Sequence, residues 1–198
     1  MDVSGAPNGA RARARRAMRV QVSAIAVGLF LQQGYDETTV EDICTAADIS
    51  RSTFFRYFPT KEDALFGLSS DTGERLLAAL AARPSGETPW TALRRALDPR
   101  LEEIAAGGVQ AGRLVRLIQN TPGLAARHRE KEAEWHQVLR PEVARRLGVN
   151  PAATSDPRAD AMIAAALGCL DAALIAWTAS EQPPELPELL DRAMAAVG

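Results

Sequence analysis

Three side chains that can hydrogen-bond to DNA follow one another in this 198-residue chain: Arg51, Ser52 and Thr53. Arginine contacts guanine edges or phosphate, and the two hydroxyls can contact either bases or the sugar-phosphate backbone. Because Ser50 precedes them and can cap a helix, we expect the three residues to form the exposed first turn of that helix. Their types and spacing predict a surface that reads base edges.

Other residues of the same stretch have the chemistry of phosphate ligands. We expect Thr39, Tyr57 and Lys61 to fix the register on DNA phosphates, with Arg56 as a further candidate. Lys61 follows Thr60, which can start a helix, and the helix dipole disfavours a cation in the first turn. We therefore expect the Lys61 ammonium to act outside the fold.

Two short helices joined by a tight turn must position these side chains. An apolar stripe from Val40 to Ala47 has helical spacing, and Thr39 with Asp42 makes a near variant of a capping box before it. Asp48 follows the stripe, and aspartate tolerates the left-handed conformation that ends a helix. This is helix-turn-helix geometry, which places the second helix in a major groove. An ordinary helical hairpin is the alternative.

The stretch TTVEDICTAADISRSTFFRYFPTK, from Thr38 to Lys61, resembles the N-terminal domain of the TetR family of transcriptional repressors. The resemblance extends from roughly Arg13 to Leu68, about a quarter of the chain. The chain departs from the family pattern at Cys44, Asp48 and Phe55, where the family has Ala, Gly and Tyr. Because Phe55 lacks the hydroxyl that family members can place near phosphate, we expect it to pack inside the domain, as we do Phe54 and Phe58.

The phrases SRSTFFRYF and TPGLAAR resemble an actinobacterial subgroup of that family, which includes the mycofactocin regulator and acyl-CoA-responsive relatives. The family resemblance implies a homodimer formed through the last two helices and a pocket for a small-molecule effector. An acyl-CoA-like effector would follow from the subgroup. The candidate pocket residues are apolar, and each could equally be ordinary core: Leu93, Leu114, Leu117, Ile118, Trp135, Ile163 and Leu167.

Composition favours an all-α fold, because aromatic residues are only 5% of the chain and no β-branched runs with a period of two occur. We expect residues 1–60 to form an N-terminal arm and the helix-turn-helix domain. Residues 61–198 would form a helical domain for ligand binding and dimerisation. One continuous helix from Lys61 to Leu80 should join the two, and Pro141 should break a later helix.

Net charge is −2, and its distribution is uneven. Residues 1–61 carry 8 Lys and Arg against 6 Asp and Glu, whereas residues 62–198 carry 15 against 19. This pattern agrees with a DNA-facing head on an acidic body. Residues 1–10 are expected to be disordered. After them comes an arginine-rich helix start that is either simply solvated or follows DNA phosphates: Arg11, Arg13, Arg15, Arg16 and Arg19.

The last two expected helices have the residue patterns that indicate dimerisation. Small residues recur along one of them, which would allow close approach of a second helix: Ala161, Ala165, Gly168, Ala172 and Ala176. The final helix has an apolar stripe: Leu186, Leu189, Leu190, Ala193, Met194 and Val197. Both helices could build a twofold interface, or both stripes could face only their own core.

The sequence contains only weak indications of a metal site, an anion site or a catalytic site. His128, Glu132 and His136 have the spacing of one helix face, but ion-paired surface residues are favoured over a metal site. Arg113 and Arg116 could meet an anionic ligand or be solvated. No nucleophile elbow, phosphate-binding glycine loop or carboxylate dyad occurs, so neither an enzyme nor a cofactor is predicted.

Location and redox state follow from two further patterns. Cys44 and Cys169 each fall on an apolar helix face and are expected to be buried free thiols. The most apolar stretch, Met162 to Trp177, is interrupted by Asp171 and is too short to span a bilayer. With no signal peptide visible, the protein is expected in the cytoplasm.

The sequence thus predicts a cytoplasmic, homodimeric regulator that binds double-stranded DNA and is released from a palindromic operator by a small apolar or amphipathic effector. The alternative is an all-α small-molecule-binding or enzymatic protein whose helix-turn-helix mediates protein contacts.

Overall fold

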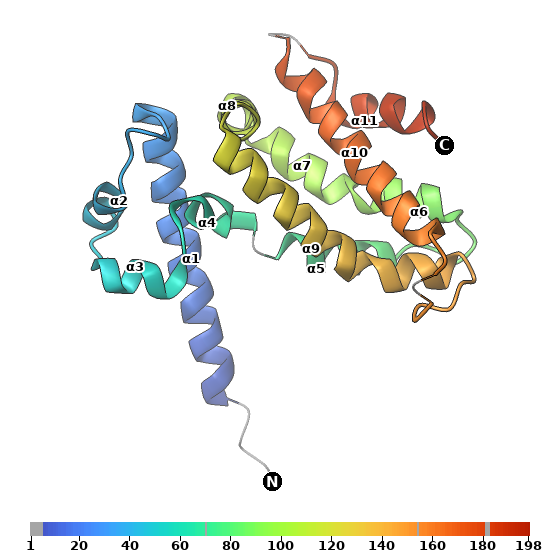
Figure 1. The fold of residues 1–198 in the computed structure, drawn as a ribbon, viewed down its shortest axis with the longest axis horizontal. Helices are drawn as coiled ribbons and strands as arrows, with labels where there is room; N and C mark the ends of the chain where they lie inside the picture. The colour runs from blue at the N-terminus through green and yellow to red at the C-terminus, as the bar shows by residue number, and fades with distance from the viewer. Residues whose placement is uncertain (1–5, 70, 154, 181–182) are drawn as a thin grey trace. The chain divides into compact units, whose positions relative to one another are not determined.

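The computed structural model describes residues 6–69, 71–153, 155–180 and 183–198. Every regular element in these ranges is a helix, which confirms the all-α class (Figure 1). The chain divides into two compact units, one ending at Ser70 and the other beginning at Asp71. This division lies beyond residue 60 because the helix that starts at Lys61 packs on the first helix of the first unit.

The part of the first unit that the structure describes contains four helices and a short 3-10 turn: α1 (Ala6–Gln33), α2 (Val40–Ala46), α3 (Arg51–Tyr57), α4 (Lys61–Phe66) and η1 (Gly67–Ser69). The disordered segment expected over residues 1–10 lies partly outside the described residues, and α1 already begins at Ala6. Thr39 and Thr60 each form a complete capping box with the aspartate three residues later, and Ser50 caps α3. Asp48 has a φ of 52°, the left-handed conformation expected of it.

The core of the first unit joins one face of α1 to the three short helices. Fully buried side chains come from α1, α2, α3, the residue that caps α3, and α4: Val22, Ala26, Phe30, Ile43, Phe54, Phe58 and Ala64. Gly67 allows η1 to lie directly against this core. A Cβ at Gly67 would meet the Ser23 Oγ at 2.0 Å and the Phe58 ring at 2.8 Å. No larger residue fits there without displacing one of them.

Within its described residues, the second unit contains seven helices: α5 (Thr72–Ala81), α6 (Pro89–Ala96), α7 (Asp98–Ala106), α8 (Gly108–Asn120), α9 (Pro122–Arg146), α10 (Arg158–Thr178) and α11 (Leu186–Ala195). Two sequence predictions about helix continuity are wrong. The single helix expected from Lys61 to Leu80 is interrupted, since α4 ends at Phe66 and α5 begins at Thr72. Conversely, α9 runs through Pro141, because Leu139 and Val143 on either side of it are anchored in the core.

Two buried arginines tie the helices of the second unit together. The Arg146 side chain is only 4% exposed and donates to the carbonyls of Leu80 and Arg83, at 2.7 and 2.8 Å, so it caps the end of α5. Arg94 is ion-paired with Asp98 and with Asp191, which fastens α11 to α6. Each buried cation has the carboxylate or carbonyl partners that a buried charge requires.

The apolar helix α10 lies at the centre of the second unit. At 21 residues it is longer than the apolar stretch Met162 to Trp177 that it contains, and by length and composition alone it could cross a membrane. Its buried positions, among them Ile163 and Leu170, belong to the core of the unit, and Asp171 interrupts the apolar run. Cys169 in α10 and Cys44 in α2 are buried and free, as expected.

Candidate functional site

The first turn of α3 presents Arg51, Ser52 and Thr53 much as the sequence predicted. Arg51 and Ser52 are exposed, and Thr53 is half-buried. The Thr53 backbone N–H donates to the Ser50 Oγ at 3.1 Å, which fixes the start of the helix. Arg51 is ion-paired with Glu41 of α2, and the two side chains are 63% and 55% exposed. An ion pair so exposed contributes little stability and can be exchanged for another partner.

Phe55 corrects the expectation that all three phenylalanines of α3 are packing residues. Phe54 and Phe58 are fully buried, whereas Phe55 is 45% exposed. Residues four apart share a helix face, so burying Phe54 and Phe58 turns the intervening Phe55 toward solvent. The Arg51 guanidinium carbon lies 5.9 Å from the centre of the Phe55 ring. Phe55 therefore lies beside Arg51 on the exposed face of α3. The family resemblance did not suggest an exposed aromatic ring at this position.

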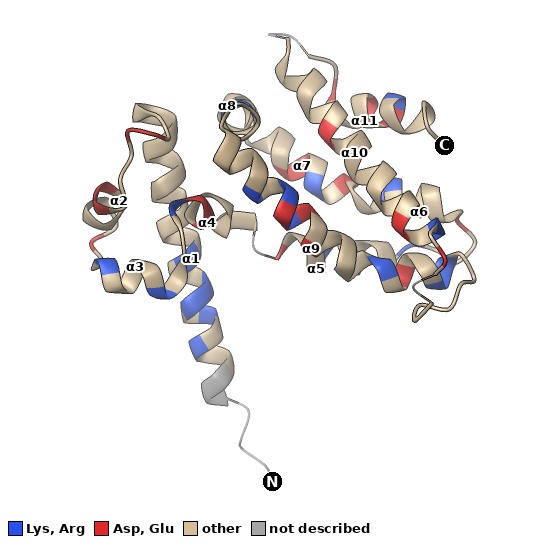
Figure 2. Ribbon diagram, viewed as in Figure 1, with Lys and Arg blue, Asp and Glu red and all other residues tan. Residues whose placement is uncertain are grey.

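A basic cleft of about 320 Å³ lies between α1 and α3. Tyr57 lines it, with the guanidinium carbons of Arg56 and Arg15 at 5.2 and 5.9 Å from the centre of its ring. Arg11, Ala14 and Met18 of α1 complete the lining. Figure 2 shows the basic residues of α1 and α3 beside this region. Three arginines around one tyrosine make a surface with the charge and donors that bind phosphate.

Arg19 of α1 has a structural role instead. Its Nη1 donates to the Tyr57 carbonyl at 2.7 Å, and its guanidinium lies 5.0 Å from the centre of the Phe58 ring. Burial lowers the pKa of Arg19, and the neighbouring Arg15 lowers it further. Arg19 thus caps the end of α3, which positions the helix relative to α1.

Lys61 acts inside the fold, contrary to the reasoning from the helix dipole. Its ammonium donates to the carbonyls of Tyr35 and Thr38, at 2.7 and 3.0 Å, and lies 3.9 Å from the centre of the Tyr35 ring. Two of its three N–H donors are thereby used to hold the loop before α2. Thr39 is exposed, but its side chain forms the α2 cap with Asp42. Contact of either residue with phosphate stays a prediction.

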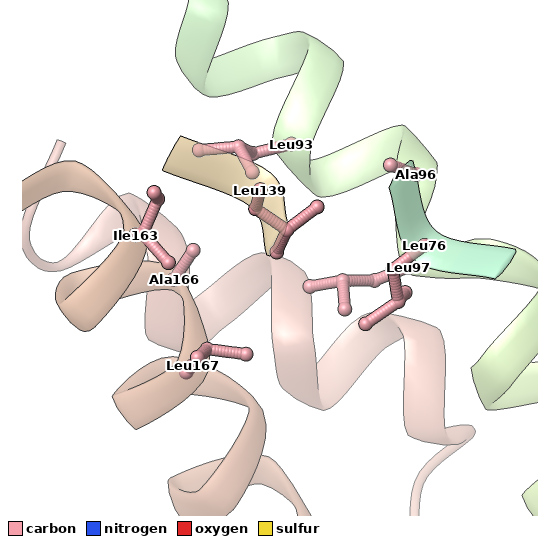
Figure 3. A pocket seen from close by; sticks show the side chains of 8 residues that line it. All are labelled: Leu76, Leu93, Ala96, Leu97, Leu139, Ile163, Ala166 and Leu167. Atoms are coloured by element: carbon pink, nitrogen blue, oxygen red, sulfur yellow. The ribbon is translucent and has the colours of Figure 1, made fainter. Parts of the chain in front are cut away.

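The second unit encloses a small apolar cavity of about 10 Å³, roughly the room that one water molecule occupies (Figure 3). Three of the predicted pocket residues line it: Leu93, Ile163 and Leu167. The other lining residues come from α5, α6, α9, α10 and the junction of α6 with α7: Leu76, Ala96, Leu97, Leu139 and Ala166. All eight are apolar, and periodicity could not distinguish them from ordinary core residues.

The remaining predicted pocket residues lie elsewhere in the second unit. Leu114, Leu117 and Ile118 on α8 are half-buried and do not line the cavity. Trp135 is 7% exposed and packs against Gly73, where a Cβ would meet its ring at 2.9 Å. The Arg116 Nη1 donates to the Thr178 carbonyl at 2.9 Å, so this cation joins α8 to the end of α10.

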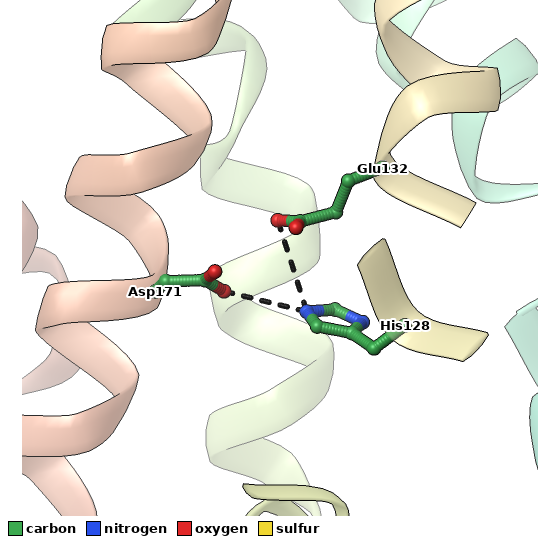
Figure 4. Close-up of side chains that lie close together, drawn as sticks. All are labelled: His128, Glu132 and Asp171. Atoms are coloured by element: carbon green, nitrogen blue, oxygen red, sulfur yellow. Dashed lines mark hydrogen bonds and ion pairs between the residues drawn. The ribbon is translucent and has the colours of Figure 1, made fainter. Parts of the chain in front are cut away.

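Two histidines of α9 pair with aspartates of α10 rather than with each other. His136 Nε2 lies 3.2 Å from Asp160 Oδ1, whereas His128 lies beside Glu132 and Asp171 (Figure 4). Burial and then the charge of Asp171 raise the pKa of Glu132, which His128 and Arg129 oppose, and the resulting pKa is about 7. The sequence had grouped His136 with His128 and Glu132, because helical spacing could not reveal which residue of α10 faces them.

Small side chains form an exposed ridge on α10. Its members are exposed except for half-buried Ala165: Ala161, Ala165, Gly168, Ala172 and Ala176. Ile175 beside the ridge is 56% exposed. On α11, by contrast, Leu186, Leu190 and Met194 are buried in their own unit. The uncovered apolar surface therefore lies mainly on α10, and Val197, two residues after the end of α11, adds a side chain that is 63% exposed.

Family comparisons identify both parts of the chain. Residues 23–66 match the family model of bacterial regulatory proteins of the tetR family. Residues 87–198, more than half of the chain, match the model of the MftR C-terminal domain. The first match contains the capped helices α2 and α3, and the second contains α10 and α11.

Individual proteins agree with these matches. The HTH-type transcriptional regulator TcmR of Streptomyces glaucescens is 38% identical, over 73% of this chain and 67% of its own length. MftR of Mycobacterium tuberculosis, a transcriptional regulator named for mycofactocin biosynthesis, is 32% identical over 64% of each chain.

Solved structures share the fold. Thermus thermophilus FadR, a TetR family repressor in complex with lauroyl-CoA, superposes with a TM-score of 0.59 at 24% identity, over 89% of this chain and 91% of its own. A regulator from Aquifex aeolicus VF5 superposes with a TM-score of 0.54 at 18% identity, over 91% and 97%. At these identities the structures support the fold and not a shared ligand.

Proposed function

Since the chain belongs to the TetR family of bacterial transcriptional regulators, we propose that it binds a palindromic operator through α3 and leaves it when a small effector enters the second unit. The observation that carries the proposal is the exposed first turn of α3, where Arg51 and Ser52 face solvent beside Phe55. In a major groove, Arg51 reads a guanine edge, and Ser52 and Thr53 contact bases or phosphate. Phe55 supplies apolar contact, for which a thymine methyl group is the matching partner.

The basic cleft supplies the contacts that are independent of sequence. Arg11, Arg15 and Arg56 surround Tyr57 on the side of α3 that adjoins α1, so a phosphate there meets several N–H donors and one hydroxyl. Thr39 at the start of α2, and the remaining N–H of Lys61, add further phosphate contacts. Such contacts fix the register of α3 and make affinity depend on salt.

Dimerisation places two such heads on one operator. Family members act as dimers, and the exposed ridge on α10 is the surface that we assign to the interface, with the outer face of α11 beside it. Alanine and glycine at Ala161, Gly168 and Ala172 allow the helices of two subunits to approach closely. A twofold axis through this ridge generates two half-sites separated by about one helical turn or somewhat more.

The effector is expected to be apolar or amphipathic, because the eight residues that line the cavity of the second unit are all apolar. At about 10 Å³ the cavity must open to admit an acyl chain. Effector binding then favours a conformation of the second unit in which the protein has lower affinity for the operator. By linkage, operator binding lowers the affinity for the effector by the same factor. An acyl-CoA is one candidate, with the lauroyl-CoA of FadR as precedent in another protein.

The alternative function is that of an all-α small-molecule-binding protein or enzyme whose first unit mediates protein contacts. A gel shift with the upstream region of the protein's own gene, repeated over a range of salt concentrations, separates the two. A regulator forms a specific complex that weakens steeply as salt rises, whereas the rival forms none. A regulator of this kind works in the cytoplasm, where its operator lies.

The effector is tested on the same complex. Adding lauroyl-CoA should release the operator, and free coenzyme A should not, because only the acyl chain can enter an apolar cavity. Release by both compounds at equal concentration would contradict the cavity as the effector site. Failure of both to release the operator would exclude long-chain acyl-CoA while leaving DNA binding intact.

A further inference from the structure

Three potential metal ligands converge between α9 and α10 of the second unit. His128 Nε2 lies 3.3 Å from Asp171 Oδ1 and 3.7 Å from Glu132 Oε1 (Figure 4). One ligand atom from each residue lies within 4.8 Å of the other two. Two ligands come from one turn of α9, and the third comes from a helix 43 residues further along the chain.

One of these atoms lacks a hydrogen bond. Glu132 Oε1 is buried and accepts no hydrogen bond from any described residue. Its nearest polar neighbour among the three, His128 Nε2, lies beyond hydrogen-bond distance at 3.7 Å. A buried carboxylate oxygen without a donor is costly unless a cation compensates it. Asp171 brings a second carboxylate to the same point, so the arrangement concentrates negative charge around one imidazole.

The two separations measured from His128 Nε2 fit tetrahedral coordination of one metal ion. Bonds of about 2.0–2.2 Å from zinc to nitrogen and oxygen place two tetrahedral ligand atoms about 3.4 Å apart. The two separations from His128 Nε2, 3.3 and 3.7 Å, lie on either side of that value. One imidazole with two carboxylates suits Zn²⁺ and its first-row neighbours better than Ca²⁺, which prefers oxygen ligands alone.

Access and local charge are also compatible with a cation. The Asp171 side chain is 40% exposed, which leaves a path to solvent and room for a water ligand. The arginine whose charge acts on His128, Arg100, lies 3.6 Å from Glu103, a carboxylate that it shares with Arg75. Glu103 therefore offsets part of the positive charge of Arg100.

The same two helices contain a natural control. His136 and Asp160 repeat the pairing of a histidine on α9 with an aspartate on α10, at 3.2 Å. There, however, Arg140 Nε donates to both Asp160 oxygens at 3.1 Å, and no second carboxylate is present among the potential ligand groups of the described residues. Both carboxylate oxygens of Asp160 thus accept hydrogen bonds from an arginine, whereas Glu132 Oε1 accepts none.

We propose that His128, Glu132 and Asp171 form a binding site for a divalent transition-metal cation, with Zn²⁺ as the best match, that links α9 to α10. The site does not depend on DNA binding, so an absent operator complex would leave it unaffected. It would add a metal-dependent constraint on the second unit, the part of the chain that contains the apolar cavity.

Titration of the full-length protein with Co²⁺ tests the site, because Co²⁺ reports its geometry by absorption and quenches nearby tryptophan. Trp135 is well placed as a reporter, since its ring centre lies 6.0 Å from that of His128. We expect saturable binding of one cation per chain, competition by Zn²⁺, and loss of the quench in Trp135→Phe. Zn²⁺ should also raise the Tm by several degrees. Absence of saturable binding at neutral pH would overturn the proposal.

Variants then locate the ligands. His128→Ala and Asp171→Asn should each weaken Zn²⁺ binding by at least about tenfold, whereas His136→Ala should leave the affinity unchanged. Circular dichroism checks the fold, and the near-isosteric Glu132→Gln decides the outcome if His128→Ala does not fold. Unchanged affinity in the ligand variants, or an equal loss in His136→Ala, would place the metal elsewhere and refute the site.

Discussion

Arg51, the first residue of α3, is ion-paired with Glu41 on α2, so in the free protein the cation that we propose as the base reader is held by the neighbouring helix. Both side chains remain largely exposed, and the pair is therefore easily exchanged for a guanine edge. If Arg51 reads a base as we propose, operator binding breaks this contact, and the two residues should have opposite effects on affinity.

Arg51→Ala should weaken specific operator binding by about 1–3 kcal/mol, because one base-edge contact is lost. Glu41→Gln should strengthen it, because the carboxylate no longer competes for the guanidinium. Gel shifts with the operator and with a scrambled duplex measure both effects. Unchanged operator affinity in Arg51→Ala would remove this residue from the site.

Lys61→Met should lower both the stability of the first unit and its affinity for DNA. Loss of the bonds to the Tyr35 and Thr38 carbonyls should lower the free energy of unfolding by about 1–3 kcal/mol, measured by urea denaturation. If the third N–H also contacts phosphate, affinity should fall for all sequences, and the salt slope should decrease by about 0.9. A stability loss with an unchanged slope would assign Lys61 to the fold alone.

The capping box of α2 should make that helix sensitive to acid. The backbone N–H of Thr39, and then its hydroxyl, lower the pKa of the Asp42 carboxyl. A depressed pKa means that the stabilisation is complete above the unfolded value, about 3.9, and is lost as pH falls through the lower folded value. The pH titration of the Thr39 amide shift by NMR measures this loss, and Asp42→Asn should abolish the dependence.

Gly67→Ala should destabilise the first unit by about 1–3 kcal/mol, because the added methyl group overlaps Ser23 and Phe58. Gly28→Ala is the matched control, since nothing lies within 4 Å of a Cβ there. That change, inside α1, should stabilise by about 0.5–1 kcal/mol. Thermal unfolding followed by circular dichroism distinguishes the two, and equal shifts would contradict the close approach of η1.

Leu139→Ala should enlarge the apolar cavity and cost about 2–5 kcal/mol in unfolding free energy. Because acyl chains would then enter more easily, less lauroyl-CoA should be needed to release the operator. Val109→Ala, at a residue 78% exposed, should change neither property. A higher lauroyl-CoA requirement in Leu139→Ala would indicate that the effector binds outside this cavity.

Local features were predictable from the sequence because the atoms that create them lie within a few residues. The caps at Thr39, Ser50 and Thr60 each involve a residue three positions later, and the left-handed Asp48 follows from its own side chain. The helix-turn-helix and the family assignment rest on these short-range patterns. Both were available before any packing was known.

Tertiary packing decided what short-range patterns could not. The exposure of Phe55 depends on which face of α3 meets α1, and the partners of Lys61 lie 23 and 26 residues away. Of the seven predicted pocket residues only three line the cavity, because helical spacing marks apolar faces without saying which ones converge. Asp171 approaches His128 across 43 residues, since the pairing of α9 with α10, and not the spacing within α9, sets which charges meet.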